Sequence, residues 1–161
     1  MKRLSLILSF ALLFVVNISS AQVTNHKLTG VWQINTSQLA DAWLNTYRFF
    51  NDGTFKYSFS QYDDTGRILA VKGTYKIKQG TLTMIVKTRT ERVGGDIVQG
   101  GQGSQQNELV LDGARIVEVK QTDHTPIVIP VKFALKKGVR TITLQLNTYY
   151  LISTDPRKEE D

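Results

Sequence analysis

The stretch LTGVWQI, residues 28–34, places one of the two tryptophans of this 161-residue chain two positions after a glycine. Successive side chains of a strand point to opposite faces, so one face of this stretch carries Leu28, Gly30, Trp32 and Ile34. Gly30 removes a side chain where a wide ring or another backbone must pass closely. The stretch therefore predicts the first strand of the fold, with the indole of Trp32 in the core.

The residues before this strand have the pattern of an export signal. Two basic residues are followed by an apolar run over residues 4–16 and by small residues that end at Ala21. This order is typical of a secretory signal peptide with cleavage before Gln22. The apolar run is shorter than the roughly 20 residues that a membrane-spanning helix needs. We therefore predict a signal peptide over residues 1–21, no membrane span, and export of a soluble protein to the periplasm or medium.

The composition restricts the class of protein. The chain has no cysteine, which excludes disulfides, thiol catalysis and zinc–thiolate sites. The formal charge of +6 falls to +4 without Lys2 and Arg3, and the remaining basic residues form no block, so we predict no nucleic-acid partner. We expect one domain over residues 22–154 and a charged flexible tail over residues 155–161.

Alternation of apolar and polar residues dominates the rest of the chain. Phe55, Tyr57 and Phe59 share one face of a strand, for example, and glycine-containing turns separate the alternating segments. The turns are too close together for crossover helices, which predicts an all-β antiparallel up-and-down meander, closed into a barrel of about 8–10 strands. A two-sheet sandwich is the alternative. The expected strands are 28–34, 46–51, 54–62, 67–77, 81–91, 95–99, 107–112, 114–121, 127–135 and 139–152.

Three segments depart from this rhythm. Residues 36–44 place Leu39 and Trp43 four positions apart, which predicts a short helix or a lid-like loop. Residues 93–107 are rich in glycine and predict a long loop or a weak, bent strand. Pro130 cannot donate to a strand ladder, so we expect a bulge or an imperfect seam there, with an edge that a protein partner could join.

Three motifs together resemble a known family. Gly30-Val31-Trp32 resembles the Gly-x-Trp signature of the first lipocalin strand, and FFNDGTFKY (residues 49–57) and GTYKIKQGTL (residues 73–82) resemble segments of the lipocalin-like domains of small exported bacterial proteins. The resemblance implies a calycin-type barrel. It also implies that Trp32 packs under a basic residue of the last barrel strand, for which Arg140 is the candidate. Gly30, Trp32 and Arg140 would then close the barrel base.

A barrel of this size can hold one small ligand or be filled by its own side chains. We predict noncatalytic binding of a small apolar or amphipathic molecule inside the barrel, with Trp43 as a lid. The alternative is a filled barrel that acts as an envelope interaction module, binding protein or glycan through its outer face or an edge strand. The predicted ligand-binding residues are Trp43, Phe55, Tyr57, Phe59, Val71, Tyr75, Met84 and Val86.

Catalytic and metal-binding patterns are weak in this sequence. The two histidines are His26 and His124, and Asp123 next to His124 is more typical of a solvated turn than of a general base. The sequence has neither a histidine pair at ligand spacing nor a calcium-loop series of acids. We therefore predict no enzyme activity, no metal and no cofactor; an enzyme that uses the barrel as a scaffold is the third hypothesis.

Overall fold

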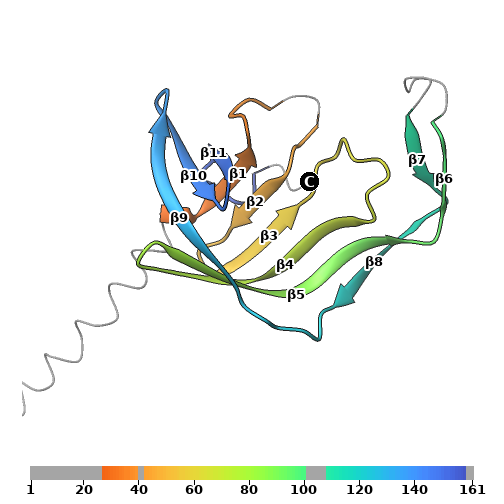
Figure 1. Ribbon diagram of the computed structural model, residues 1–161, viewed down its shortest axis with the longest axis horizontal. Helices are drawn as coiled ribbons and strands as arrows, with labels where there is room; N and C mark the ends of the chain where they lie inside the picture. The colour runs from red at the N-terminus through yellow and green to blue at the C-terminus, as the bar shows by residue number, and fades with distance from the viewer. Residues whose placement is uncertain (1–26, 40–41, 101–107, 159–161) are drawn as a thin grey trace, which may run out of the picture.

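A computed structural model describes residues 27–39, 42–100 and 108–158. These residues form an all-β fold (Figure 1). The expected signal peptide, His26 and residues 101–107 of the glycine-rich segment lie outside the described residues. No helix formed by the described residues is long and apolar enough to cross a bilayer. The strands are β1 (Gly30–Ile34), β2 (Thr46–Phe49), β3 (Thr54–Ser58), β4 (Ile68–Lys78), β5 (Thr81–Val93), β6 (Asp96–Gln99), β7 (Leu109–Asp112), β8 (Arg115–Lys120), β9 (Ile127–Lys136), β10 (Val139–Leu144) and β11 (Asn147–Ser153).

Eight antiparallel strands are hydrogen-bonded into a ring. The order around the ring is β1, β2, β3, β4, β5, β9, β10 and β11, and β11 pairs with β1 to close it. This barrel-like arrangement confirms the predicted fold class. Strands β6, β7 and β8 interrupt the meander between β5 and β9, so the ring is not formed by consecutive strands alone.

Strand β5 changes partner along its length. Its first part, Thr81–Met84, pairs with β9 inside the ring, whereas Thr88–Val93 pairs with β8. The β4–β5 pair therefore extends past the ring, and the separate β6–β7 sheet stands at its far end (Figure 1). Backbone N–H of Leu111 donates to the carbonyl of Asp64 at 3.1 Å, which ties β7 to the loop between β3 and β4.

The inward-facing residues pack as the alternation predicts. Trp32 is 1% exposed and its Nε1 donates to the carbonyl oxygen of Leu28 at 2.6 Å. A Cβ on Gly30 would overlap the carbonyl oxygen of Ser153, so the close neighbour that requires glycine is the backbone of β11. Gly30 also has a φ of +132°, which an L side chain rarely adopts. The opening stretch is thus a core strand whose glycine admits its neighbour.

Of the two alternatives predicted for residues 36–44, a short helix or a lid-like loop, the helix is not supported. The described residues 36–39 and 42–44 contain no helix, and a side chain of β1 binds backbone groups in both parts. The Gln33 side chain donates to the carbonyl of Gln38 at 3.0 Å and accepts from the N–H of Leu44 at 3.3 Å. Leu39 is exposed instead of sharing a buried face with Trp43. The Gln33 side chain of β1 thus binds both described parts of this segment, which are loop.

The expected single strand over residues 139–152 is also wrong, because it is a hairpin of β10 and β11. The connection at Gln145 and Leu146 has no glycine, although Gln145 adopts a left-handed φ of 54°. A bulge or an imperfect seam was expected at Pro130, and the pairing of β9 does change there. β9 pairs with β5 up to Pro130 and with β10 from Val131 onward, so the strand changes partner at this residue.

Candidate functional site

Six of the eight predicted ligand-binding residues lie at the inner side of the ring, in the core or packed against it. Phe55, Tyr75 and Met84 are buried in the core, and Tyr57, Val71 and Val86 pack against it. The ring of Phe59 lies 5.0 Å from that of Tyr57. A Cβ on Gly73 would overlap the carbonyl oxygen of Ile85, so this glycine accommodates a close approach of β5. The space at Gly73 is therefore taken up by backbone.

Aromatic rings pack against one another in this interior. The centroid of the Phe49 ring lies 4.9 Å from that of the Tyr75 ring. The centroid of the Tyr47 ring lies 4.4 Å from that of Tyr57 and 5.2 Å from that of Tyr149. Edge-to-face and tilted pairs of this kind add to the stability gained by burial. Phe55, Tyr75 and Met84 thus belong to the core, and their role as ligand contacts stays a prediction.

The tyrosine hydroxyls of the interior are held neutral. Burial raises the pKa of each of the hydroxyl groups of Tyr47, Tyr57 and Tyr149 above the usual range of tyrosine. A side-chain hydrogen bond joins Tyr57 to Tyr149. Burial also raises the pKa of Tyr75 to about 12, and its hydroxyl donates to the carbonyl of Phe50 at 2.9 Å. Near neutral pH these groups serve as hydrogen-bonding groups without charge.

Trp43 does not join this cluster. The guanidinium carbon of Arg48 lies 5.2 Å from the centre of the Trp43 ring, a cation–π contact. Arg48 lies between the inward-facing Tyr47 and Phe49 on β2, so its side chain points to the outer face. Trp43 therefore contacts the outer face of β2, and its predicted role as a lid over the barrel stays a prediction. Arg48 also donates to the carbonyls of Pro156 and Lys158, which fixes the described part of the expected tail.

An apolar pocket lies against the buried Trp32. We call it the Trp32 pocket; its volume is about 520 Å³. Phe133 and Leu135 have the same orientation along β9 as the buried Val131, yet they are 44% and 70% exposed. The hairpin end that carries them stands clear of the neighbouring strands (Figure 1). The lining residues are Lys27, Trp32, Phe133, Ala134, Leu135, Arg140 and Thr141.

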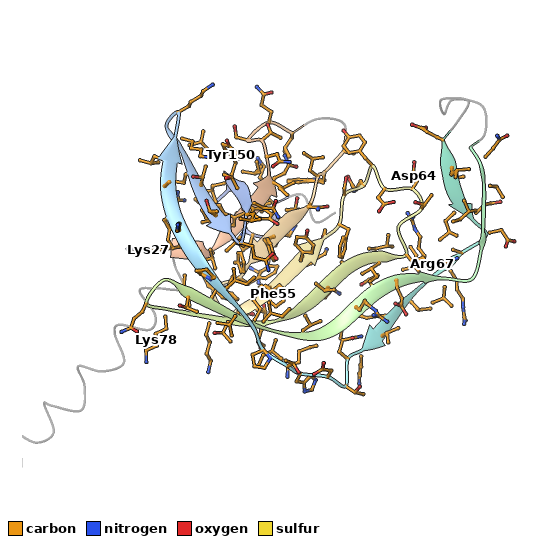
Figure 2. All side chains as sticks on the ribbon, viewed as in Figure 1. Lys27, Phe55, Asp64, Arg67, Lys78 and Tyr150 are labelled. Carbon is orange, nitrogen blue, oxygen red and sulfur yellow. The ribbon has the colours of Figure 1, made fainter. Side chains whose placement is uncertain are left out.

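This pocket contains two of the three residues predicted for the barrel base. Trp32 and Arg140 both line it, whereas the stacking of Arg140 on Trp32 stays a prediction. Lys27 adds a second cation, and Figure 2 places it beside β9. Apolar walls with two cations at one site suit a molecule that has an apolar body and an anionic group. Phe133 and Leu135 were missed in the sequence because alternation places them in the core.

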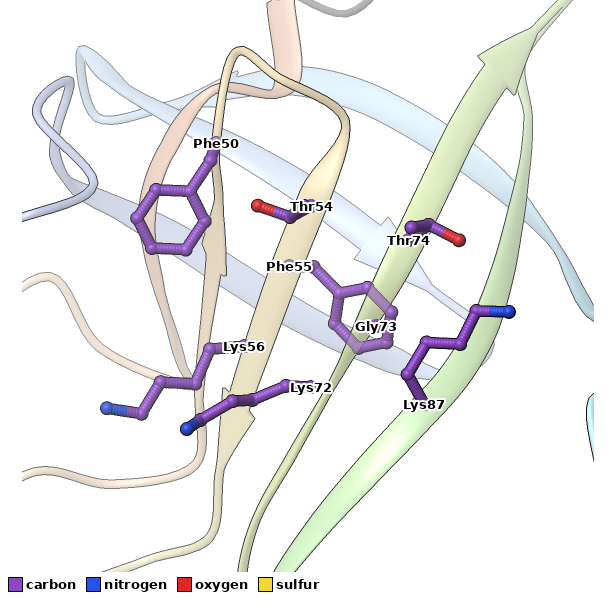
Figure 3. A pocket seen from close by; sticks show the side chains of 8 residues that line it. All are labelled: Phe50, Thr54, Phe55, Lys56, Lys72, Gly73, Thr74 and Lys87. Carbon is purple, nitrogen blue, oxygen red and sulfur yellow. The ribbon is translucent and has the colours of Figure 1, made fainter. Parts of the chain in front are cut away.

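A second pocket lies on the outer face of the sheet (Figure 3). We call it the lysine pocket; its volume is about 420 Å³. Lys56 and Lys72 extend side by side from β3 and β4, the Phe50 ring lies at one side and Lys87 lies on β5 (Figure 3). Sequence reasoning missed this site, because its lysines come from three strands. The lining residues are Phe50, Thr54, Phe55, Lys56, Lys72, Gly73, Thr74 and Lys87.

The remaining candidates for chemistry lie apart from both pockets. Asp123 Oδ1 accepts from the N–H and the hydroxyl of Thr125 at 2.8 and 2.6 Å, and these bonds lower the pKa of the carboxyl group. His124 lies in the same exposed turn. Among the described residues, no three histidine, aspartate or glutamate side chains are placed to share a metal ion. No family model, curated protein or solved structure matches this chain.

Proposed function

We propose that this chain is an exported, noncatalytic, lipocalin-like protein that binds a small amphipathic anion in the Trp32 pocket. The observation that carries the proposal is the exposure of Phe133 and Leu135 beside Lys27 and Arg140. Large apolar side chains that gather at a concave surface mark a binding site, because covering them releases water. The cations would orient the anionic group of the ligand while the apolar walls hold its body.

The site differs from the one that the sequence predicts. Phe55, Tyr75 and Met84 of the predicted site are buried in the core, so a ligand that contacts them would have to displace packed side chains. Removing a buried aromatic side chain from its packing costs roughly 3–5 kcal/mol. A ligand at the Trp32 pocket meets side chains that are already exposed, which favours this end of the ring.

The proposal is tested by fluorescence titration of the purified chain with 11-(dansylamino)undecanoic acid, and with its methyl ester as the uncharged comparison. Replacing both Phe133 and Leu135 by serine should weaken binding of the acid about tenfold or more, because each apolar side chain contributes roughly 1.5–3 kcal/mol when it is covered. Arg140→Gln should weaken the acid about threefold and leave the ester unchanged.

Val128→Ser is the matched control, because Val128 is an exposed apolar residue of the same strand that lies outside the pocket. Its affinity for the acid should equal that of the unaltered chain. Two outcomes would reject the pocket as the site. In the first, the chain with both Phe133 and Leu135 replaced still binds the acid with unchanged affinity. In the second, Val128→Ser weakens binding of the acid as much as the Phe133 and Leu135 double substitution does.

A further inference from the structure

The outer face of β3, β4 and β5 carries a groove that the proposed function does not use. Lys56 pairs in register with Lys72, and Lys72 pairs with Thr88, so these side chains project from the same face. The register shifts between Lys72 and Gly73, and Lys87 is the extra residue on β5. This irregularity brings a third lysine to the lysine pocket.

A neighbouring pocket of about 420 Å³ continues the groove, because Lys56 and Lys72 line both pockets. Its other walls include hydroxyl and amide side chains, which suit a ligand rich in hydroxyl groups. We call the two pockets together the outer groove. The polar residues of the second pocket are Lys56, Ser58, Ser60, Gln61, Asp63, Lys72, Thr90 and Arg92.

The charge of the outer groove is positive. Lys72 forms an ion pair with Glu118 at 3.1 Å, and Asp63 is the acidic residue that lines the groove. Lys87 has no ion-pair partner among the residues that the structure describes. Arg92 donates to the carbonyls of Asp64 and Gly66 and so holds the loop that forms one wall. A ligand that fits this groove carries negative charge.

The strand pairing decides which kind of polymer can bind. A peptide that joins a sheet needs a strand with an unpaired edge. Strand β3 is hydrogen-bonded to β2 and β4, β4 to β3 and β5, and β5 at Thr88 to β4 and β8. The backbone of the outer groove is therefore not available for strand addition. Recognition at this face must rely on side chains.

We propose that the outer groove binds an acidic polysaccharide. Sugar rings present C–H groups on one face, which pack on an aromatic ring, and Phe50 lies at the side of the lysine pocket with its ring half-buried (Figure 3). The three lysines would bind the acidic groups, and the hydroxyl and amide side chains of the second pocket would bind the sugar hydroxyls. This site is separate from the Trp32 pocket and does not depend on a ligand there.

The experiment measures binding of hexagalacturonate to the whole chain by isothermal titration calorimetry, with maltohexaose as the neutral sugar and hexaglutamate as the acidic peptide. The unaltered chain should bind hexagalacturonate and neither comparison ligand. Replacing Lys56, Lys72 and Lys87 together by glutamine should weaken binding about tenfold, because exposed ion pairs contribute little each but add up. Phe50→Leu should weaken binding of hexagalacturonate about threefold, whereas Phe50→Tyr should keep the affinity of the unaltered chain. This difference is expected for a C–H contact with an aromatic face.

A triple variant that replaces Lys78, Lys132 and Lys137 by glutamine removes the same charge outside the outer groove. It should bind hexagalacturonate as the unaltered chain does. Equal weakening in both triple variants would show a general charge effect and overturn the proposal. Tighter binding of hexaglutamate would assign the groove to acidic protein segments, and lack of binding to hexagalacturonate would overturn it as well. Circular dichroism confirms that each variant is folded before its result counts.

Discussion

Two parts of the inward-facing side of this sheet differ in what covers them. Inside the ring, Phe49 has no exposed surface and its aromatic ring lies 4.9 Å from that of Tyr75. On the β9–β10 hairpin, Phe133 and Leu135 continue the face of the buried Val131 but are largely exposed. The alternation along the strands is the same in both places. The strands across the ring cover the first set, whereas the hairpin end extends beyond them.

This difference shows that the face to which a side chain points does not by itself decide whether the side chain is buried. The period of two in a sequence fixes the face to which a side chain points. Burial depends in addition on whether another strand lies opposite, which is a property of strand lengths and of ring closure. Apolar residues that point to the core side of the sheet but have no strand opposite them are therefore the ones available to a ligand.

The largest effect is expected in the ring interior. Phe49→Ala should lower the free energy of unfolding by about 3–5 kcal/mol, because it removes a fully buried ring from contact with other aromatic side chains. Urea denaturation followed by circular dichroism measures the change. Phe49→Leu is the matched control; it keeps part of the apolar volume and should lose less.

A loss below about 1 kcal/mol for Phe49→Ala, the size typical of an ordinary substitution, would contradict the filled interior. It would instead support the hollow barrel that is one of the two sequence interpretations. The ring interior and the β9–β10 hairpin end would then no longer differ, because apolar side chains would lie next to empty space in both places.

An intermediate effect is expected at high pH. Burial raises the pKa of Tyr75 from 10.0 to about 12, so the unfolded chain loses this proton before the folded chain does. The stability that this shift contributes is complete below pH 10 and is lost as the pH rises from about 10 to about 12. Thermal unfolding measured over this range should show a smaller alkaline loss for Tyr75→Phe than for the unaltered chain. Equal pH dependence of both proteins would contradict burial of the hydroxyl.

Much of the fold could be predicted from the sequence because it depends on local signals. The turn glycines Gly53, Gly80, Gly113 and Gly138 adopt a left-handed conformation, as glycines in tight turns are expected to do, whereas Gly66 does not. The seam at Pro130 follows from its missing N–H group. The turn at Gln145 and Leu146 was missed because a non-glycine residue occupies its left-handed position.

The candidate sites could be predicted less well, because they depend on nonlocal geometry. Trp43 was expected as a lid over the barrel, and alternation does not indicate its contact with the nearby Arg48, whose side chain points to the outer face. The outer groove depends on which lysines of β3, β4 and β5 come into register, and on the shift at Lys72. A pairing register between strands cannot be read from alternation alone, since each slip of two residues keeps the same face inward.

The smallest effect on stability is expected at the hairpin end. Phe133→Ala should change the free energy of unfolding by less than about 1 kcal/mol, although the same substitution at Phe49 costs several times more. The reason is that Phe133 is 44% exposed and so gives up little burial when it is truncated. Urea denaturation under the conditions used for Phe49→Ala provides the measurement. A loss as large as that of Phe49→Ala would show that Phe133 belongs to the core. The Trp32 pocket would then be part of the packed interior, and its exposed apolar wall could not be a surface kept for a ligand.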